Sequence, residues 1–164
     1  MKKITSGILL MITALGFSQN NPINFETGGN GAAWTWNTFE NPSTPCAPLE
    51  IIANPDPSGA NPSATVAKLT PLLGAPPYAG VESQHGTAIG TFTLSATNCT
   101  VKIMVWKSVL SDVGIKFATA SGGSTGELKV ANTVVNQWQE LTFDFSGKIG
   151  EPTSTDIDQI VIFP

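Results

Sequence analysis

Apolar and polar residues alternate along three separate stretches of this 164-residue chain, and this alternation constrains its fold most strongly. In Cys99–Lys107, valine or isoleucine occupies three odd positions in turn, while Lys102 and Trp106 stand on the even ones. The stretches 113–117 and 139–145 repeat the pattern. Successive side chains of an extended strand point to opposite faces, so each stretch predicts a strand with one face in a core and the other toward water.

Short runs of this kind follow one another along the chain, separated by turns rich in glycine and proline. We expect strands at residues 23–26, 34–39, 49–53, 64–70, 78–83, 89–94, 100–107, 114–119, 127–131, 139–145 and 159–163. Among 164 residues, 16 are glycine and 12 are proline, as suits a chain with many turns. The pattern predicts an all-β fold, a two-sheet antiparallel β-sandwich.

The N-terminus has the layout of a secretory signal peptide. Two lysines precede an apolar run at 8–15, and Gly16 and Ser18 supply small residues at the positions that signal peptidase reads. The run is too short to span a bilayer, which favours cleavage before residue 19. We therefore expect a signal peptide over 1–18 and a single domain over 19–164, secreted or displayed on a bacterial cell surface. Because the chain ends on its last predicted strand, we also expect it to be one module of a longer protein.

The charge of the chain limits the classes of partner that we expect, and its cysteine content bears on a disulfide. Eight lysines face twelve acidic residues without forming a basic cluster, so neither nucleic acid nor membrane is an expected partner. Cys46 and Cys99 are the only cysteines. In an oxidising compartment they predict a disulfide, which would contribute about 3–4 kcal/mol by closing a loop of roughly 50 residues. Two unpaired thiols are the alternative.

Catalytic motifs are scarce. Glycoside hydrolysis needs two carboxylates across the scissile bond, and the chain shows no close acidic constellation. The single histidine, His85, has no arginine to accompany it, since all basic residues are lysines. We predict that the protein is not an enzyme, and a polysaccharide lyase or glycoside hydrolase with an unrecognised site is the lesser alternative.

Glu26 stands in the first predicted strand and Asp158 directly before the last one, and first and last strands are often neighbours in a sandwich. With backbone carbonyls around Gly28, they would offer the oxygen ligands that Ca²⁺ prefers. A turn-capping glutamate and a solvated aspartate are the alternative, and spacing alone favours it.

Three landmarks resemble a known family. They are Phe25-Glu26 with its glycine turn and the tryptophans after it, the stretch 136–145, and the stretch 157–162. Together they resemble β-jelly-roll carbohydrate-binding modules of the galactose-binding-like superfamily, of the kind found in secreted proteins of marine Bacteroidetes. The resemblance implies a jelly-roll topology, a structural calcium at Glu26 and Asp158, and a structural role for Trp138.

Trp106 is the leading candidate for a ligand contact, because a large indole on the wet face of a sheet suits stacking on a sugar ring. Tyr78, Gly80 and Glu82 fall on the same face of a predicted strand. An aromatic ring and a carboxylate separated by a glycine would suit a sugar groove. The full set of candidate ligand contacts is Trp36, Tyr78, Glu82, Gln84, His85, Lys102 and Trp106. For Trp36 and Tyr78, packing in the core is the rival interpretation.

The sequence therefore predicts non-catalytic polysaccharide binding, stabilised by calcium, that targets an attached enzyme or surface protein to glycan. A secreted adhesion or protein-interaction module is the main alternative, and a test of Trp106 separates the two.

Overall fold

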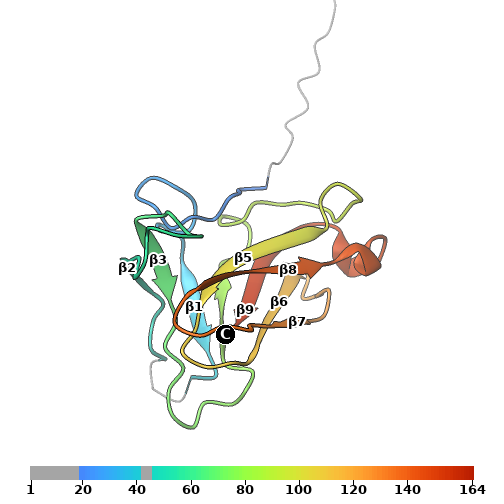
Figure 1. The fold of residues 1–164 in the computed structure, drawn as a ribbon. Coiled ribbons are helices and arrows are strands. Elements are labelled where there is room, and N and C mark those ends of the chain that lie inside the picture. The colour runs from blue at the N-terminus through green and yellow to red at the C-terminus, as the bar shows by residue number, and fades with distance from the viewer. Residues whose placement is uncertain (1–18, 42–45) are drawn as a thin grey trace, which may run out of the picture.

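The computed structural model describes residues 19–41 and 46–164, and the predicted signal peptide lies outside them. The described chain is built from antiparallel strands with two single turns of 3₁₀ helix (Figure 1). The strands are β1 (Trp36–Phe39), β2 (Glu50–Ala53), β3 (Thr65–Lys68), β4 (Gly80–Ser83), β5 (Thr100–Trp106), β6 (Asp112–Thr119), β7 (Leu128–Ala131), β8 (Trp138–Asp144) and β9 (Ile157–Phe163). The helical turns are η1 (Ser146–Lys148) and η2 (Pro152–Ser154), both between β8 and β9.

One layer is a five-stranded antiparallel sheet in the order β1-β4-β9-β6-β7. Its central strand β9 is buried over nearly its whole length, as expected for a strand with neighbours on both sides. Ile162 of β9 lies opposite Val81 of β4 and Ile115 of β6, which aligns aliphatic side chains across the sheet.

The second layer is divided into two ribbons. Strands β2 and β3 pair only with each other, and so do β5 and β8. Figure 1 shows the β5–β8 ribbon crossing the five-stranded sheet, with the β2–β3 ribbon to one side. No hydrogen-bonded strand pairing joins the two ribbons within the described residues. The structure therefore confirms an all-β architecture of antiparallel sheets that is consistent with a sandwich.

The core lies between the layers and confirms the alternation. The three aliphatic residues of β5 pack against a buried cluster that includes Leu141 and Phe143 of β8 and Val113, Ile115 and Phe117 of β6. Phe117 contacts the ring of Phe145, with ring centroids 5.0 Å apart. Burying side chains of this size contributes about 1.5–3 kcal/mol each, so this face determines the register of the sheets.

Nine of the predicted strands are confirmed within about two residues at either end, and two predictions are wrong. Residues 23–26 form no strand, because Phe25 has a φ of 57° and Ile23 makes only an isolated bridge to Asn30. Residues 89–94 are interrupted at Gly90, whose φ is 78°, and keep a single bridge from Phe92 to Ile157. Apolar alternation is present in both stretches, but the backbone leaves the extended region.

The predicted disulfide is wrong in this structure, where Cys46 and Cys99 are both free thiols. Cys99 precedes β5 and packs against the core cluster, whereas Cys46 lies on the connection between β1 and β2. A disulfide requires Cβ atoms about 3.8 Å apart, and spacing along the chain carries no information on that distance.

Candidate ligand-binding cleft

The two ribbons and the five-stranded sheet enclose a cleft of about 980 Å³. One wall comes from β3 and the opposite wall from β5, while the N-terminal residues 19–25 border it. Its floor is aliphatic and includes Val81, Val113 and Ile160 of the five-stranded sheet. Small-molecule sites in proteins commonly enclose about 300–1,000 Å³ with an apolar lining and a few polar groups, so the cleft has the size and character of a ligand site.

The edge of β5 that faces away from β8 carries backbone groups with no hydrogen bond in the described structure. The amide of Phe145 donates to the carbonyl of Cys99 at 2.7 Å, which makes this a hydrogen-bonded pair of the β5–β8 ladder. Such pairs alternate along an antiparallel ladder. The odd positions of β5 therefore bond to β8, and the N–H and C=O groups of Lys102 and Met104 point outward from the ribbon edge.

Trp106 lies at the end of β5 directly opposite Trp138, the first residue of β8. Their ring centroids are 5.7 Å apart with an angle of 68° between planes, an edge-on contact. Both indoles are half-buried, and both line the cleft. Their parity is opposite to that of the buried aliphatic residues, so the indole pair stands on the wet face of the ribbon, as the alternation predicted.

Asn54, just after β2, attaches the long loop 54–63 to this indole pair. Its side-chain oxygen accepts a hydrogen bond from the indole nitrogen of Trp138 at 2.9 Å. Its side-chain nitrogen donates to the carbonyls of Asn61 and Ser63 at 2.8 and 2.7 Å. The loop is therefore closed on itself and anchored to the β5–β8 ribbon through one buried amide.

Two lysines of the β5 wall differ in how they are held. The ammonium of Lys102 pairs with Glu140 at 2.8 Å, and both side chains are about half exposed. The ammonium of Lys107 donates to the hydroxyl of Ser111 at 2.5 Å and to the Asp112 carbonyl at 3.3 Å. Burial lowers the pKa of Lys107, and the nearby charge of Asp112 opposes that shift. Lys107 thus secures the turn into β6, while Lys102 remains accessible.

Four of the predicted ligand residues, Tyr78, Glu82, Gln84 and His85, do not line the cleft with Trp106. Tyr78 is 57 % exposed on the connection before β4. Glu82 lies in β4 of the five-stranded sheet, and Gln84 and His85 directly follow that strand. The Nδ1 atom of His85 is hydrogen-bonded to an Asp158 carboxylate oxygen at 2.7 Å.

Trp36 borders the cleft but is held in an aromatic cluster. Its indole nitrogen donates to the Gly31 carbonyl at 2.9 Å, and its ring stacks on that of Trp34 with centroids 5.8 Å apart. The ring of Phe25 contacts it from another side at 5.7 Å. These contacts favour the packing interpretation of Trp36 over a ligand contact.

The residues expected to hold calcium have other partners. Glu26 accepts hydrogen bonds from the amides of Ala64 and Thr65 and from the Thr65 hydroxyl, using both carboxylate oxygens. Asp158 is paired with His85 instead. Gly28 lies in an exposed turn, and no group of three or more His, Cys, Asp or Glu gathers in the described chain. The donor set around Glu26 therefore does not fit a cation, and calcium stays a prediction from the resemblance.

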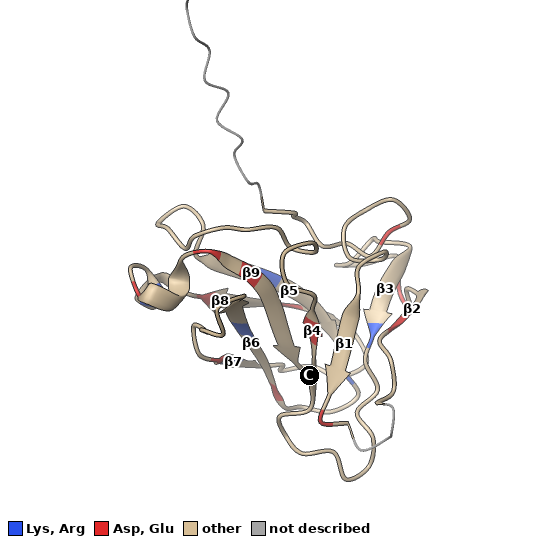
Figure 2. Ribbon diagram, turned by 180° about the vertical axis from the view of Figure 1, so that it is seen from behind, with Lys and Arg blue, Asp and Glu red and all other residues tan. Residues whose placement is uncertain are grey.

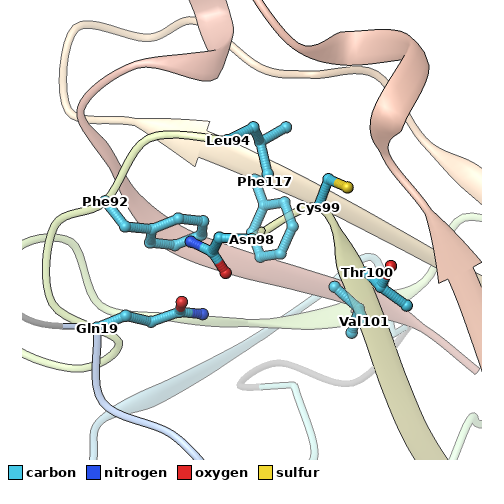
Figure 3. Close-up of a pocket in the computed structure, with 8 residues that line it drawn as sticks. All are labelled: Gln19, Phe92, Leu94, Asn98, Cys99, Thr100, Val101 and Phe117. Carbon is cyan, nitrogen blue, oxygen red and sulfur yellow. The ribbon is translucent and has the colours of Figure 1, made fainter. Parts of the chain in front are cut away.

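Trp138 is the site residue that the sequence argument discounted. The signal that points to it is the pairing of two alternating stretches: once β5 and β8 are neighbours, both indoles fall on the same face. A second, much smaller pocket of about 20 Å³ is lined by residues that include Phe92, Cys99 and Phe117 (Figure 3), and it holds no more than about one water.

Figure 2 shows the lysine positions in blue and the acidic positions in red, spread over several strands and loops of the backbone. Among the described residues, no helix combines the length and apolar character that a membrane crossing requires. No protein-family profile, curated protein or solved structure matches the chain.

Proposed function

We propose that the domain binds polysaccharide without cleaving it, and that the wet face of the β5–β8 ribbon, beside the cleft, is the binding surface. The observation that carries the proposal is the Trp106–Trp138 pair, two half-buried indoles of which Trp138 is hydrogen-bonded to Asn54. As a module of a longer secreted protein, it would hold an attached enzyme or a cell surface against glycan. This function agrees with the family resemblance of the sequence.

The indole pair suits a sugar ring for a physical reason. Sugar C–H faces are apolar and stack on aromatic rings, whereas sugar hydroxyls require directed hydrogen bonds. The indole nitrogen of Trp138 is already bonded to Asn54, so ligand binding does not have to reorient that ring. Preorganised aromatic side chains lose little conformational entropy on binding.

Directed polar partners flank the indoles. The outward backbone groups of Lys102 and Met104 offer donors and acceptors in alternation along β5, and Asn61 and Ser63 lie on the opposite lip. A glycan laid along this edge would pair its hydroxyls with fixed backbone groups, which do not pay the ordering entropy of flexible side chains.

The acid distribution supports a non-catalytic role. All twelve Asp and Glu residues fall in the described part of the chain, and none of them lines the cleft. Acid–base hydrolysis of a glycoside in this cleft would lack its pair of carboxylates. Among the described residues, the His85–Asp158 pair is the arrangement that most favours an enzyme, and neither residue lines the cleft.

Affinity electrophoresis across a panel of polysaccharides tests the proposal. We expect at least one glycan to retard the parent domain and Trp106→Ala to abolish most of that retardation. Tyr78→Ala is the matched control, since Tyr78 is an exposed aromatic residue outside the ribbon. Retardation that survives Trp106→Ala would refute the assignment of Trp106.

The protein-interaction alternative is favoured by one observation, the exposed apolar residues at the same end of the ribbon. Val109 and Leu110 are more than 60 % exposed, and Val135 is 38 % exposed. Asn132 draws their loops together by donating to the carbonyls of Val109 and Val134. Absence of retardation by any glycan would favour this alternative.

A further inference from the structure

The charges around the cleft are unevenly distributed. Three of the six described lysines line it, namely Lys68, Lys102 and Lys107. None of the twelve acidic residues does, although acids outnumber lysines in the chain as a whole. Lysines are therefore the charged side chains that line the cleft, on a protein that carries a formal net charge of −4.

Lys68 and Lys102 stand on opposite walls, one at the end of β3 and one within β5. Each is paired with an acid outside the lining, Lys68 with Glu50 at 3.2 Å and Lys102 with Glu140 at 2.8 Å. The side chains of both pairs are about half exposed. Exposed ion pairs contribute little, so each ammonium can exchange its partner for an anionic ligand at small cost.

Lys107 contributes charge but not a direct contact. Its ammonium is occupied by Ser111 and by the Asp112 carbonyl, and it lies partly buried at the end of β5. A partly buried charge is screened less by salt than an exposed one, so Lys107 adds to the potential of the cleft, and the nearby carboxylate of Asp112 offsets part of it.

We propose that the glycan bound at this surface is anionic, carrying carboxylate or sulfate groups that Lys102 contacts directly and Lys68 contacts across the cleft. This inference rests on the proposed function and specifies its ligand class. An ammonium is a compact point charge with three donors, so it accepts either anion without a geometric preference. The β5 edge and Trp106 bind the sugar body, and the lysines select its charge.

The test compares three probes, a polyuronate, a sulfated galactan and a neutral glucan, by isothermal titration or affinity electrophoresis. We expect one or both anionic glycans to bind and the neutral one to bind at least tenfold more weakly. Lys102→Gln should weaken anionic binding about fivefold, as befits one exposed charged contact. Raising the salt concentration should weaken it further.

Lys129→Gln is the matched control, because Lys129 forms an exposed ion pair with Glu127 on β7, away from the cleft. An equal loss in both variants would overturn the role of Lys102. Binding of the neutral glucan with equal affinity, abolished by Trp106→Ala, would overturn the anionic ligand and leave the proposed function standing. Binding of none of the probes or of a wider panel would overturn the proposed function, and this inference with it.

Discussion

Replacement of Asn54 by alanine tests how the candidate site is assembled. Asn54 is 8 % exposed and its side chain takes part in four hydrogen bonds. It accepts from the indole of Trp138 and the amide of Asp56, and it donates to the carbonyls of Asn61 and Ser63. Alanine removes all four hydrogen bonds at once, and their partners must then bond to water.

The size of the effect follows from these bonds. A neutral hydrogen bond contributes about 0.5–1.5 kcal/mol net, and an unsatisfied partner costs more the deeper it is buried. All four bonds of Asn54 are partly buried, so water replaces some of them. We expect Asn54→Ala to lower the free energy of unfolding by about 3 kcal/mol.

Denaturant unfolding followed by tryptophan fluorescence measures this loss. Asn37→Ala is the control, because Asn37 is exposed in β1 and makes no side-chain hydrogen bond in the described structure, so its loss should stay within about 0.5 kcal/mol. Trp138→Phe removes the indole N–H donor and keeps an aromatic ring, and its coupling energy with Asn54→Ala should be about 1 kcal/mol. A cost below about 1 kcal/mol for Asn54→Ala would refute the anchoring of loop 54–63 by this residue.

Three further outcomes are expected. A Cβ at Gly80 would stand 2.6 Å from the Ile162 carbonyl oxygen, so Gly80→Ala should lower the free energy of unfolding by about 1–3 kcal/mol. A Cβ at Gly147 would have no other atom within 4 Å, so Gly147→Ala should leave the unfolding midpoint unchanged or slightly higher. The Ser146 amide, and then its hydroxyl, lower the pKa of Asp144, so this group adds stability above its unfolded pKa that is lost as pH falls through the folded one. Asp144→Asn should flatten the decline of stability below about pH 4, and parallel acid titrations of the two proteins would refute this. If calcium is bound, Tm should fall in excess chelator, and an identical Tm would end that hypothesis.

Parity along the chain predicted the core face of β5 correctly because side-chain direction in a strand is a local property. The same holds for Leu141 and Phe143 of β8, which are buried as their alternation indicated. Apolar alternation failed at Gly90, where a positive φ turns the chain inside a stretch with strand composition. Local pattern gives the direction of a side chain, but a single glycine decides whether the strand exists.

The contact between Asn54 and Trp138 was beyond prediction for another reason. The two residues are 84 positions apart, and their hydrogen bond depends on how the two ribbons of the second layer approach each other. No hydrogen-bonded strand pairing fixes that approach in the described structure, so no register rule applies to it. Trp138 was discounted as a ligand contact because its own strand position is compatible with packing. Only its pairing with Trp106 across the ladder shows that the two indoles share a face.

Glu26 has a different partner in the structure from the one that the sequence predicted. A carboxylate early in the chain was expected to meet Asp158, since first and last strands are often adjacent. In the structure β9 lies between β4 and β6, and Glu26 instead accepts the Thr65 amide at the start of β3. The backbone amide of Asn54 donates to the Ala64 carbonyl, so these two residues are a hydrogen-bonded pair of the β2–β3 ladder. Because such pairs alternate along the ladder, the backbone N–H of Thr65 points away from β2, toward the open edge of β3. The open edge of a strand presents unpaired N–H donors that other groups of the protein must cover. Because the second layer is divided into two ribbons, the edge of β3 is open, and Glu26 accepts a hydrogen bond from that edge.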